Sequence, residues 1–207
     1  MKRLVITGTD TDIGKTVFAA GLTAALNATY WKPVQSGLAG KTDSEIVAEL
    51  SGRPTLPEAY RLPLPASPHL SAENAGVEIE IDRLLPPTIT ETLIIEGAGG
   101  LMVPLNRSIF YLDLFAHWKA PVILVARTAL GTINHTALSL MALRNAGCDV
   151  IGVAFVGAAE PAVEQTIVQM CNIPHLGRLD MISPLTSAGL TRAFEAIDLA
   201  TIRKALG

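Results

Sequence analysis

The sequence predicts an α/β fold in which a doubly wound, mostly parallel sheet has helices on both faces. Several short runs are continuously apolar rather than alternating, which is typical of strands buried on both faces of a parallel sheet. Helical patterns lie between these runs, at a spacing that suits right-handed strand–helix–strand crossovers. The polar stretch TGTDTDIGKT follows the first apolar run directly and leads into the first helical pattern.

The expected strands and helices alternate along most of the chain. We expect strands at 4–6, 29–34, 93–95, 121–126 and 150–156. We expect helices at 15–28, 43–52, 133–147, 161–172 and 191–206. Residues 53–90 interrupt this alternation and hold more than half of the 13 prolines. We expect an irregular surface segment there, of the kind that often covers a functional site.

Composition narrows the class of protein. A chain of 207 residues suits a single domain over residues 1–207. The net charge is −3, and lysine and arginine form no basic run, so nucleic acid and anionic membranes are not expected partners. No apolar stretch approaches the roughly 20 residues of a membrane span, and the N-terminus lacks a signal-peptide pattern. Cys148 and Cys171 form no CxxC pair. We therefore expect a cytoplasmic protein.

The stretch Thr7–Thr16 contains the tail of a phosphate-binding P-loop, Gly14-Lys15-Thr16. Free backbone N–H groups and the helix dipole at such a bend attract an anion. Lys15 would reach the β- and γ-phosphates of a nucleotide, and the Thr16 hydroxyl would bind Mg²⁺. The match is imperfect, because Thr9 stands where the usual first glycine belongs. The alternative interpretation is a turn with a capping threonine.

Two acids in the same loop need compensation. A carboxylate close to a triphosphate costs free energy unless a cation offsets it. Asp10 or Asp12 therefore indicates either Mg²⁺ or a second ligand that carries ammonium groups.

Two further candidates follow expected strands. Lys32, in KPVQSG, would end a strand at the edge where the P-loop lies, and could neutralise charge on a transferring phosphoryl group. Ser36 could hydrogen-bond a small substrate. Glu96, in LIIEGAGG, is placed like the metal-binding carboxylate of P-loop NTPases. The alternatives are a surface lysine and a solvated strand-end glutamate.

Two other motifs allow two interpretations each. Thr42 and Glu45 have the spacing of a helix capping box, while Asp43 between them could contribute to a metal site. The sequence LGTINH, residues 130–135, is either a plain helix start or a second anion site suited to a carboxylate.

Together these motifs resemble the dethiobiotin synthetase family. TGTDTDIGKT, KPVQSG, SPHLSAE, EGAGG with a nearby VPL, PVILV and LGTINH follow the order found in that family, over residues 3 to about 180. The resemblance implies a homodimer of the P-loop class related to nitrogenase iron protein. It implies ATP-dependent carboxylation and ring closure of 7,8-diaminononanoate with CO₂, through a carbamate and a carbamic-phosphoric anhydride, in biotin biosynthesis.

The resemblance also implies roles for individual residues. Lys15, Lys32 and Thr11 would be catalytic, and Thr16, Asp43 and Glu96 would bind Mg²⁺. Thr11, Lys32 and Ser36 would lie near the diamine, and the partner subunit would supply Gly131, Thr132, Ile133 and Asn134 for its distal carboxylate. The nucleotide would lie against Asp12, Ile13, Gly14, Lys15, Thr16, Val17, Asp43, Glu96, Gly97, Ala98, Gly99, Val156 and Gly157.

The base-binding region departs from the family pattern. Several relatives carry an Asn-Asp pair where this chain has Val156-Gly157, and an acidic residue where it has Arg178. A valine side chain cannot hydrogen-bond adenine. We expect base recognition to rest on backbone groups near 174–178 or to be lax, with weak discrimination among nucleoside triphosphates.

Two rival functions fit less well. Amidotransferase-type ligases of the same superfamily usually carry a glutaminase domain, for which 207 residues leave no room. Partitioning or maturation NTPases carry a second lysine early in the loop, where this chain has Thr9 and Asp10.

Overall fold

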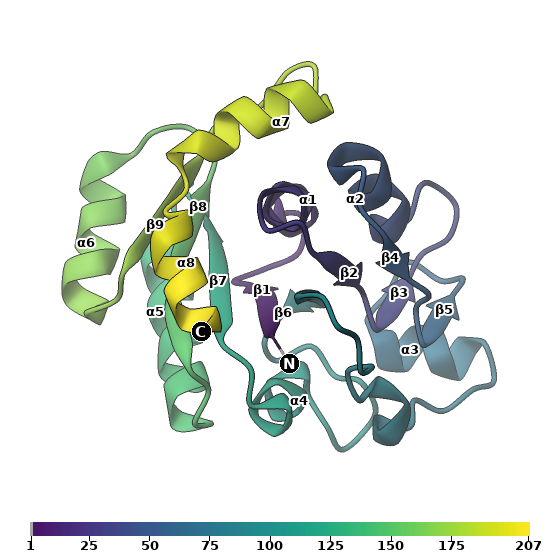
Figure 1. Ribbon diagram of the computed structural model, residues 1–207. Coiled ribbons are helices and arrows are strands. Elements are labelled where there is room, and N and C mark those ends of the chain that lie inside the picture. The colour runs from purple at the N-terminus through teal and green to yellow at the C-terminus, as the bar shows by residue number, and fades with distance from the viewer. Residues whose placement is uncertain (1) are drawn as a thin grey trace.

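The computed structural model describes residues 2–207. Its central sheet has seven strands in the order β4-β2-β6-β1-β7-β8-β9, and every neighbouring pair is parallel (Figure 1). The strands are β1 (Arg3–Gly8), β2 (Thr29–Trp31), β4 (Thr55–Leu56), β6 (Leu93–Gly100), β7 (Val122–Arg127), β8 (Val150–Val156) and β9 (His175–Leu179). The order changes direction at β1, so the sheet is doubly wound, and the predicted fold class is confirmed.

Two apolar clusters lie on opposite faces of the sheet. One cluster packs the sheet against α4 (Tyr111–Trp118), α5 (Thr132–Asn145) and α6 (Pro161–Cys171). The other packs it against α1 (Lys15–Ala25), α2 (Asp43–Ser51), α7 (Ser187–Ala193) and α8 (Leu199–Leu206). Figure 1 shows the first group along the left and lower sides, and α1, α2 and α7 across the upper part. Strands buried on both faces explain the continuous apolar runs.

The expected strand at 29–34 is two strands in different sheets. β2 ends at Trp31, and β3 (Val34–Ser36) pairs with β5 (Tyr60–Leu62) in a small parallel sheet. Pro33 lies between them and has no N–H group to continue the β2 ladder. Its carbonyl instead accepts a hydrogen bond from the Tyr60 amide. The break turns the chain and carries residues 34–37 toward the P-loop edge of the sheet.

The expected C-terminal helix at 191–206 is wrong, because two helices occupy that region. α7 ends at Ala193, and α8 begins after Asp198, whose side chain accepts a hydrogen bond from the Thr201 amide. Between them, a 3₁₀ turn, η2 (Phe194–Ala196), buries Phe194 against α1. The other four expected helices are present, with ends that differ by a few residues.

Residues 53–90 are more ordered and more buried than expected. They contain β4, β5, α3 (Pro68–Asn74) and the 3₁₀ helix η1 (Ile81–Leu84). Leu62, Ile79 and Leu84 are almost fully buried, so this segment completes one apolar cluster. The sequence patterns also missed α4 and β9.

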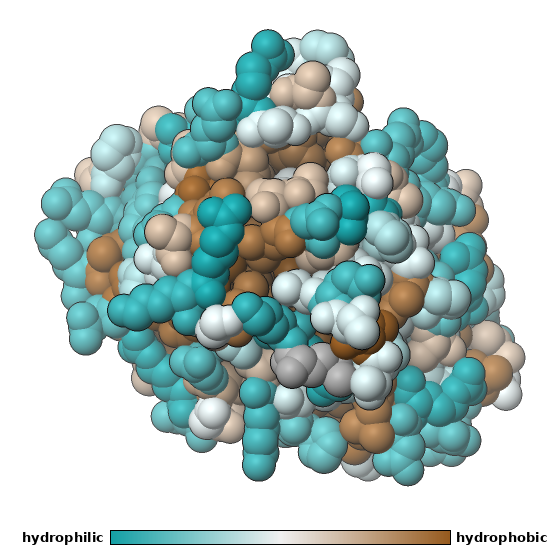
Figure 2. Space-filling model, in the orientation of Figure 1, coloured by the Kyte–Doolittle hydropathy of each residue, from teal (hydrophilic) through white to brown (hydrophobic). Residues whose placement is uncertain are grey.

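The face of the molecule shown in Figure 2 is mostly polar. In Figure 2 polar side chains cover much of the visible face, and apolar surface shows around α1, α7 and α8. None of the helices within residues 2–207 combines the length and apolar character that a membrane crossing requires.

Candidate functional site

The loop between β1 and α1 forms an anion-binding bend. Gly14 precedes α1 with a φ of 94°, in the left-handed region that favours glycine. The neighbouring Val156 side chain also leaves no room for a side chain at this position. A Cβ at Gly14 would lie 2.7 Å from Val156 Cγ1. No side chain caps α1, so its first N–H groups face the loop without an intrahelical partner. These groups and the helix dipole make the bend suitable for phosphate.

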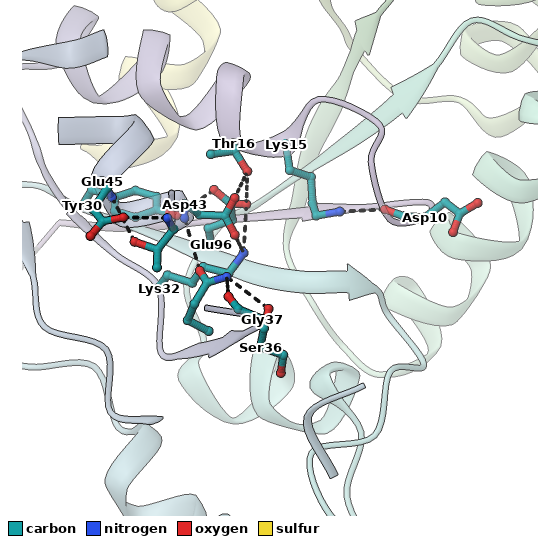
Figure 3. Close-up of polar contacts among 12 residues, drawn as sticks. Asp10, Lys15, Thr16, Tyr30, Lys32, Ser36, Gly37, Asp43, Glu45 and Glu96 are labelled. Atoms are coloured by element: carbon teal, nitrogen blue, oxygen red, sulfur yellow. Dashed lines mark hydrogen bonds and ion pairs between the residues drawn. The ribbon is translucent and has the colours of Figure 1, made fainter. Parts of the chain in front are cut away.

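Four polar side chains, from α1, α2, β6 and the residue that follows β2, meet beside this bend (Figure 3). Thr16 Oγ1 lies 2.6 Å from Asp43 Oδ1 and 3.0 Å from Glu96 Oε1. The Lys32 ammonium pairs with Asp43 and lies 3.4 Å from Glu96 Oε1. Residues up to 80 positions apart in sequence therefore share one polar cluster.

Each member of this cluster is placed by the local fold. Glu96 pairs with Ile6 in the sheet register, and Lys32 follows the last residue of β2. Asp43 is the first residue of α2, where the predicted capping box is confirmed: the Thr42 amide donates to Glu45 Oε2 at 2.7 Å, and the Glu45 amide to Thr42 Oγ1 at 3.3 Å. Capping and a place in the site are thus compatible.

The cluster's donor set fits Mg²⁺. Two carboxylates and one hydroxyl are hard oxygen ligands, and Mg²⁺ commonly uses one or two carboxylates together with substrate phosphates. Within residues 2–207 no group of three or more His, Cys, Asp or Glu side chains is placed to hold a metal ion. Two carboxylates and one hydroxyl would leave coordination positions that a phosphate ligand could complete.

Lys32 and Asp43 stabilise each other's charged forms. Burial alone would lower the pKa of Lys32, but the carboxylates of Glu96 and Asp43 outweigh it and raise that pKa above its ordinary value. Burial alone would raise the pKa of Asp43, but Lys32 and the Thr16 hydroxyl outweigh it and lower that pKa. Both groups are charged at neutral pH.

Lys15 has a different environment. Its ammonium donates to the Asp10 carbonyl at 2.6 Å, and burial lowers its pKa, although Glu96 opposes that effect. The Asp10 carboxylate accepts a hydrogen bond from the Thr11 amide at 2.8 Å and lies 3.6 Å from Arg127 Nη2. The Thr11 amide and Arg127 therefore offset part of the negative charge of Asp10. The sequence analysis assigned this role to Mg²⁺ or to a cationic ligand.

A cavity of about 850 Å³ opens over the polar cluster. We call it the charged cavity. The Ser36 hydroxyl in its wall is buried and has no hydrogen-bond partner within residues 2–207. The expected covering segment contributes residues 65–68 to the same wall. Predicted site residues that line it are Thr11, Asp12, Gly14, Lys15, Thr16, Val17, Lys32, Ser36, Asp43, Glu96, Ala98 and Gly99.

A second cavity, of about 520 Å³, lies on the other side of the P-loop. We call it the apolar cavity. Its lining includes the predicted residues Asp12, Ile13, Gly14, Val17, Val156 and Gly157. Both backbone polar groups of Gly157 are already used, since its amide donates to the Leu179 carbonyl and its carbonyl accepts from Arg178. The chain that closes this cavity is Leu179–Ile182 with Leu185, not the expected 174–178.

Some predicted residues lie elsewhere. A Cβ on Gly97 would meet Phe115 Cζ at 2.7 Å, so this glycine makes room for a core side chain and does not line either cavity. Gly131, Thr132, Ile133 and Asn134 form the start of α5 and line neither cavity of their own chain.

Sequence reasoning missed several residues at the site. The Tyr30 hydroxyl lies 2.8 Å from Glu96 Oε2, and the Gln35 side chain accepts from the Asp43 amide at 3.2 Å. Burial, followed by the charge of Glu96, raises the pKa of Tyr30 well above its ordinary value, so its hydroxyl stays protonated. The signal that could have identified Gln35 is its place in the KPVQSG motif. Tyr30 offered a weaker signal, a residue with a polar hydroxyl in an expected strand.

Comparison with known proteins agrees with this architecture. A family model described as an AAA domain matches residues 2–189. A ParA family ATPase from Chlorobium tepidum has a TM-score of 0.58 at 12% identity, over 100% of this chain and 98% of that one. The Pyrococcus furiosus cell division ATPase MinD has a TM-score of 0.57 at 14% identity, over 99% of each chain. At such low identity these two structures show the fold alone.

Two curated sequence relatives are much more similar, and both are named ATP-dependent dethiobiotin synthetase BioD. The one from Rhodopseudomonas palustris (strain HaA2) is 55% identical over 196 residues, 93% of this chain and 92% of the relative. The one from Sphingopyxis alaskensis is 53% identical over 204 residues, 98% of this chain and all of the relative. This similarity spans both cavities and the polar cluster, and the chain therefore belongs to the family of ATP-dependent dethiobiotin synthetases.

Proposed function

We propose that residues 1–207 form one catalytic domain that converts 7,8-diaminononanoate, CO₂ and ATP into dethiobiotin, ADP and phosphate at the charged cavity. The observation that carries this proposal is the convergence of Lys32, Asp43, Glu96 and Thr16 beside an uncapped helix N-terminus. That arrangement combines a phosphate site, a cation site and a buried ammonium group around one space large enough for a small substrate.

The reaction needs charge neutralisation and positioning more than proton transfer by a histidine. One amine adds CO₂ and becomes a carbamate, whose oxygen then attacks the γ-phosphorus of ATP and expels ADP. The second amine attacks the resulting mixed anhydride at its carbonyl carbon, closes the five-membered ring and expels phosphate. Ring closure is intramolecular, and well-oriented cases reach effective molarities of roughly 10⁵ M or more.

The residues of the charged cavity match these steps. Lys32 would neutralise the negative charge of the carbamate and of the γ-phosphoryl group that the carbamate attacks. Lys15 would bind the β- and γ-phosphates. Thr16, Asp43 and Glu96 would hold Mg²⁺, which offsets triphosphate charge when bound. Ser36, whose hydroxyl lacks a partner, and Thr11 would hydrogen-bond the diamine or its carbamate.

The apolar cavity would hold the nucleotide base. Its lining is mainly apolar, although Asp12, Arg127, Thr128, Glu160 and Asp180 also contribute to it, and the two residues at the usual base-reading position offer no polar side chain. Val156 packs against Gly14, and the backbone groups of Gly157 are bonded to β9 and Arg178. The base would be held by shape and burial, which favours weak discrimination among nucleoside triphosphates.

A second copy of the chain would complete the substrate site. Leu130, just before α5, is fully exposed, and Leu138 and Met141 of α5 are each more than half exposed. Met102, also more than half exposed, lines a cavity with Leu138, and we propose that the four residues form one apolar face. A shallow cavity of about 330 Å³ connects this face to Thr11 of the P-loop. A homodimer formed through this face would bring Gly131–Asn134 of the partner subunit toward the diamine's carboxylate. We further propose a cytoplasmic location.

The deciding experiment is a coupled assay of phosphate release. The proposal predicts that release from ATP requires both bicarbonate and the diamine, and that dethiobiotin forms in equal amount. Phosphate release that is independent of either co-substrate would contradict the proposal and would favour a simple NTPase.

A further inference from the structure

The hydroxyl of Tyr30 has one partner in the structure. Tyr30 pairs with Ile94 across β2 and β6, two residues before Glu96, so all three side chains lie on the α1 face of the sheet. The ring is fully buried in the apolar cluster beneath α1, and its hydroxyl lies 2.8 Å from Glu96 Oε2 (Figure 3). A phenylalanine would fill the same space without burying a polar atom.

The two oxygens of Glu96 consequently have separate partners. Oε2 accepts from Tyr30, while Oε1 faces Thr16 at 3.0 Å and Lys32 at 3.4 Å. Glu96 is fully buried, so an Oε2 without a donor would carry a desolvation penalty or turn toward another donor. The nearest polar groups in the same cluster are those of Thr16 and Lys32, which already serve Oε1.

We propose that Tyr30 is a positioning residue for the metal-binding carboxylate: its hydroxyl holds Oε2 of Glu96 and so keeps Oε1 turned toward Thr16 and the charged cavity. This inference rests on the proposed Mg²⁺ site. Partners of this kind, which orient a metal ligand without touching the metal, typically change metal affinity or activity by about 10- to 100-fold when removed.

The chain provides a matched control. Tyr111 is also fully buried, packs with an aromatic neighbour in the opposite apolar cluster, and has a hydroxyl without a hydrogen-bond partner in residues 2–207. Tyr30→Phe and Tyr111→Phe therefore remove the same atom from equally buried rings. Only the first change removes a bond to Glu96.

The test uses Mn²⁺ as the probe, measured by electron paramagnetic resonance of free Mn²⁺ with the full chain and ADP present. We expect the Mn²⁺ dissociation constant to rise about 10-fold or more in Tyr30→Phe and to stay unchanged in Tyr111→Phe. ADP affinity measured in EDTA should be the same in both variants. Thermal unfolding of each variant verifies that it is folded.

The variant Glu96→Gln distinguishes failure of the proposed Mg²⁺ site from failure of the role proposed for Tyr30. If it leaves Mn²⁺ binding unchanged, the metal assignment is wrong and the role of Tyr30 is wrong with it. If it weakens Mn²⁺ binding while Tyr30→Phe does not, only the inference about Tyr30 is overturned. In the double variant, Tyr30→Phe should add little to the effect of Glu96→Gln, because it acts through that carboxylate; fully additive losses would also overturn it.

Discussion

The two cavities on either side of the P-loop differ in the chemistry of their walls. The charged cavity gathers acidic and basic side chains from α1, α2, β6 and the residue that follows β2, and Lys32 pairs with both Asp43 and Glu96. The apolar cavity is lined mainly by apolar residues and by backbone whose polar groups are partly used elsewhere, with fewer polar side chains among them: Asp12, Arg127, Thr128, Glu160 and Asp180. Recognition by charge demands particular residues, whereas recognition by shape tolerates exchange, and the two cavities should respond to mutation accordingly.

The largest effect is expected at Lys32 in the charged cavity. Lys32→Ala should leave nucleotide affinity nearly intact and reduce turnover by roughly 100-fold or more, because a preorganised donor to the reacting phosphoryl group is lost. The measurement is kcat from coupled phosphate release beside the Kd for ADP. Lys41→Ala is the control, since Lys41 is largely exposed and pairs with Glu49 at the surface. Unchanged turnover in Lys32→Ala would remove this residue from the mechanism.

A second change tests the shape of the apolar cavity. Gly157 has a φ of 132°, and a Cβ there would lie 2.5 Å from Thr128 Oγ1. Gly157→Ala should lower the free energy of unfolding by about 1–3 kcal/mol and raise KM for ATP. Gly40→Ala is the control, because Gly40 is exposed and has open space around it. Equal stability losses in denaturant unfolding of the two variants would contradict the packing argument.

Nucleotide preference sharpens the comparison directly. Because no side chain of Val156 or Gly157 can read a base, kcat/KM for ATP, CTP and GTP should differ by well under ~100-fold, the discrimination that paired base-reading contacts supply. A preference for ATP above that level would show that the apolar cavity reads the base through groups of another kind.

The smallest effect concerns pH. The folded-state pKa of Asp43 is below its ordinary value, so the unfolded chain takes up the proton first as pH falls. Asp43 therefore contributes stability above a pH of about 4, its ordinary value, and that contribution is lost as pH falls through the lowered pKa. The difference in unfolding free energy between wild type and Asp43→Asn should be constant from pH 8 to 5 and shrink below pH 4. A difference that persists unchanged at pH 3 would argue against the pairing with Lys32.

Sequence patterns predict the charged cavity far better than the apolar one. Glu96, Asp43 and Lys32 occur in short motifs whose residue types indicate phosphate and metal binding. Parallel strands also bring their carboxyl ends to one edge of the sheet, so residues that follow different strands are expected to lie close together. The closing segment of the apolar cavity contributes mostly apolar residues, Leu179, Met181, Ile182 and Leu185, together with Asp180, and this mixture has no distinctive sequence pattern. Arg178 contacts two lining residues of this cavity, the Gly157 carbonyl and the Asp180 carboxylate, and the contact with Gly157 is visible in three dimensions alone.

The same limit explains the errors in the fold. The helical pattern at 191–206 is continuous, but burial of Phe194 and the Asp198 cap divide it. Strand β9 contains His175 and Arg178, whose polar side chains pair with the buried Glu164, and so it lacks the apolar run of the other strands. The local pattern of apolar and polar residues cannot indicate such contacts, because they join residues that are distant in the sequence.

Asp12, Gly14, Val17 and Leu185 line both cavities, so these four residues separate the site proposed for the base from the site proposed for the triphosphate. If the proposed sites are right, most of the binding energy for a nucleotide would come from the triphosphate, which all nucleoside triphosphates share. The nucleotide consumed would then follow cellular supply, and the most abundant triphosphate would be used without having to be selected.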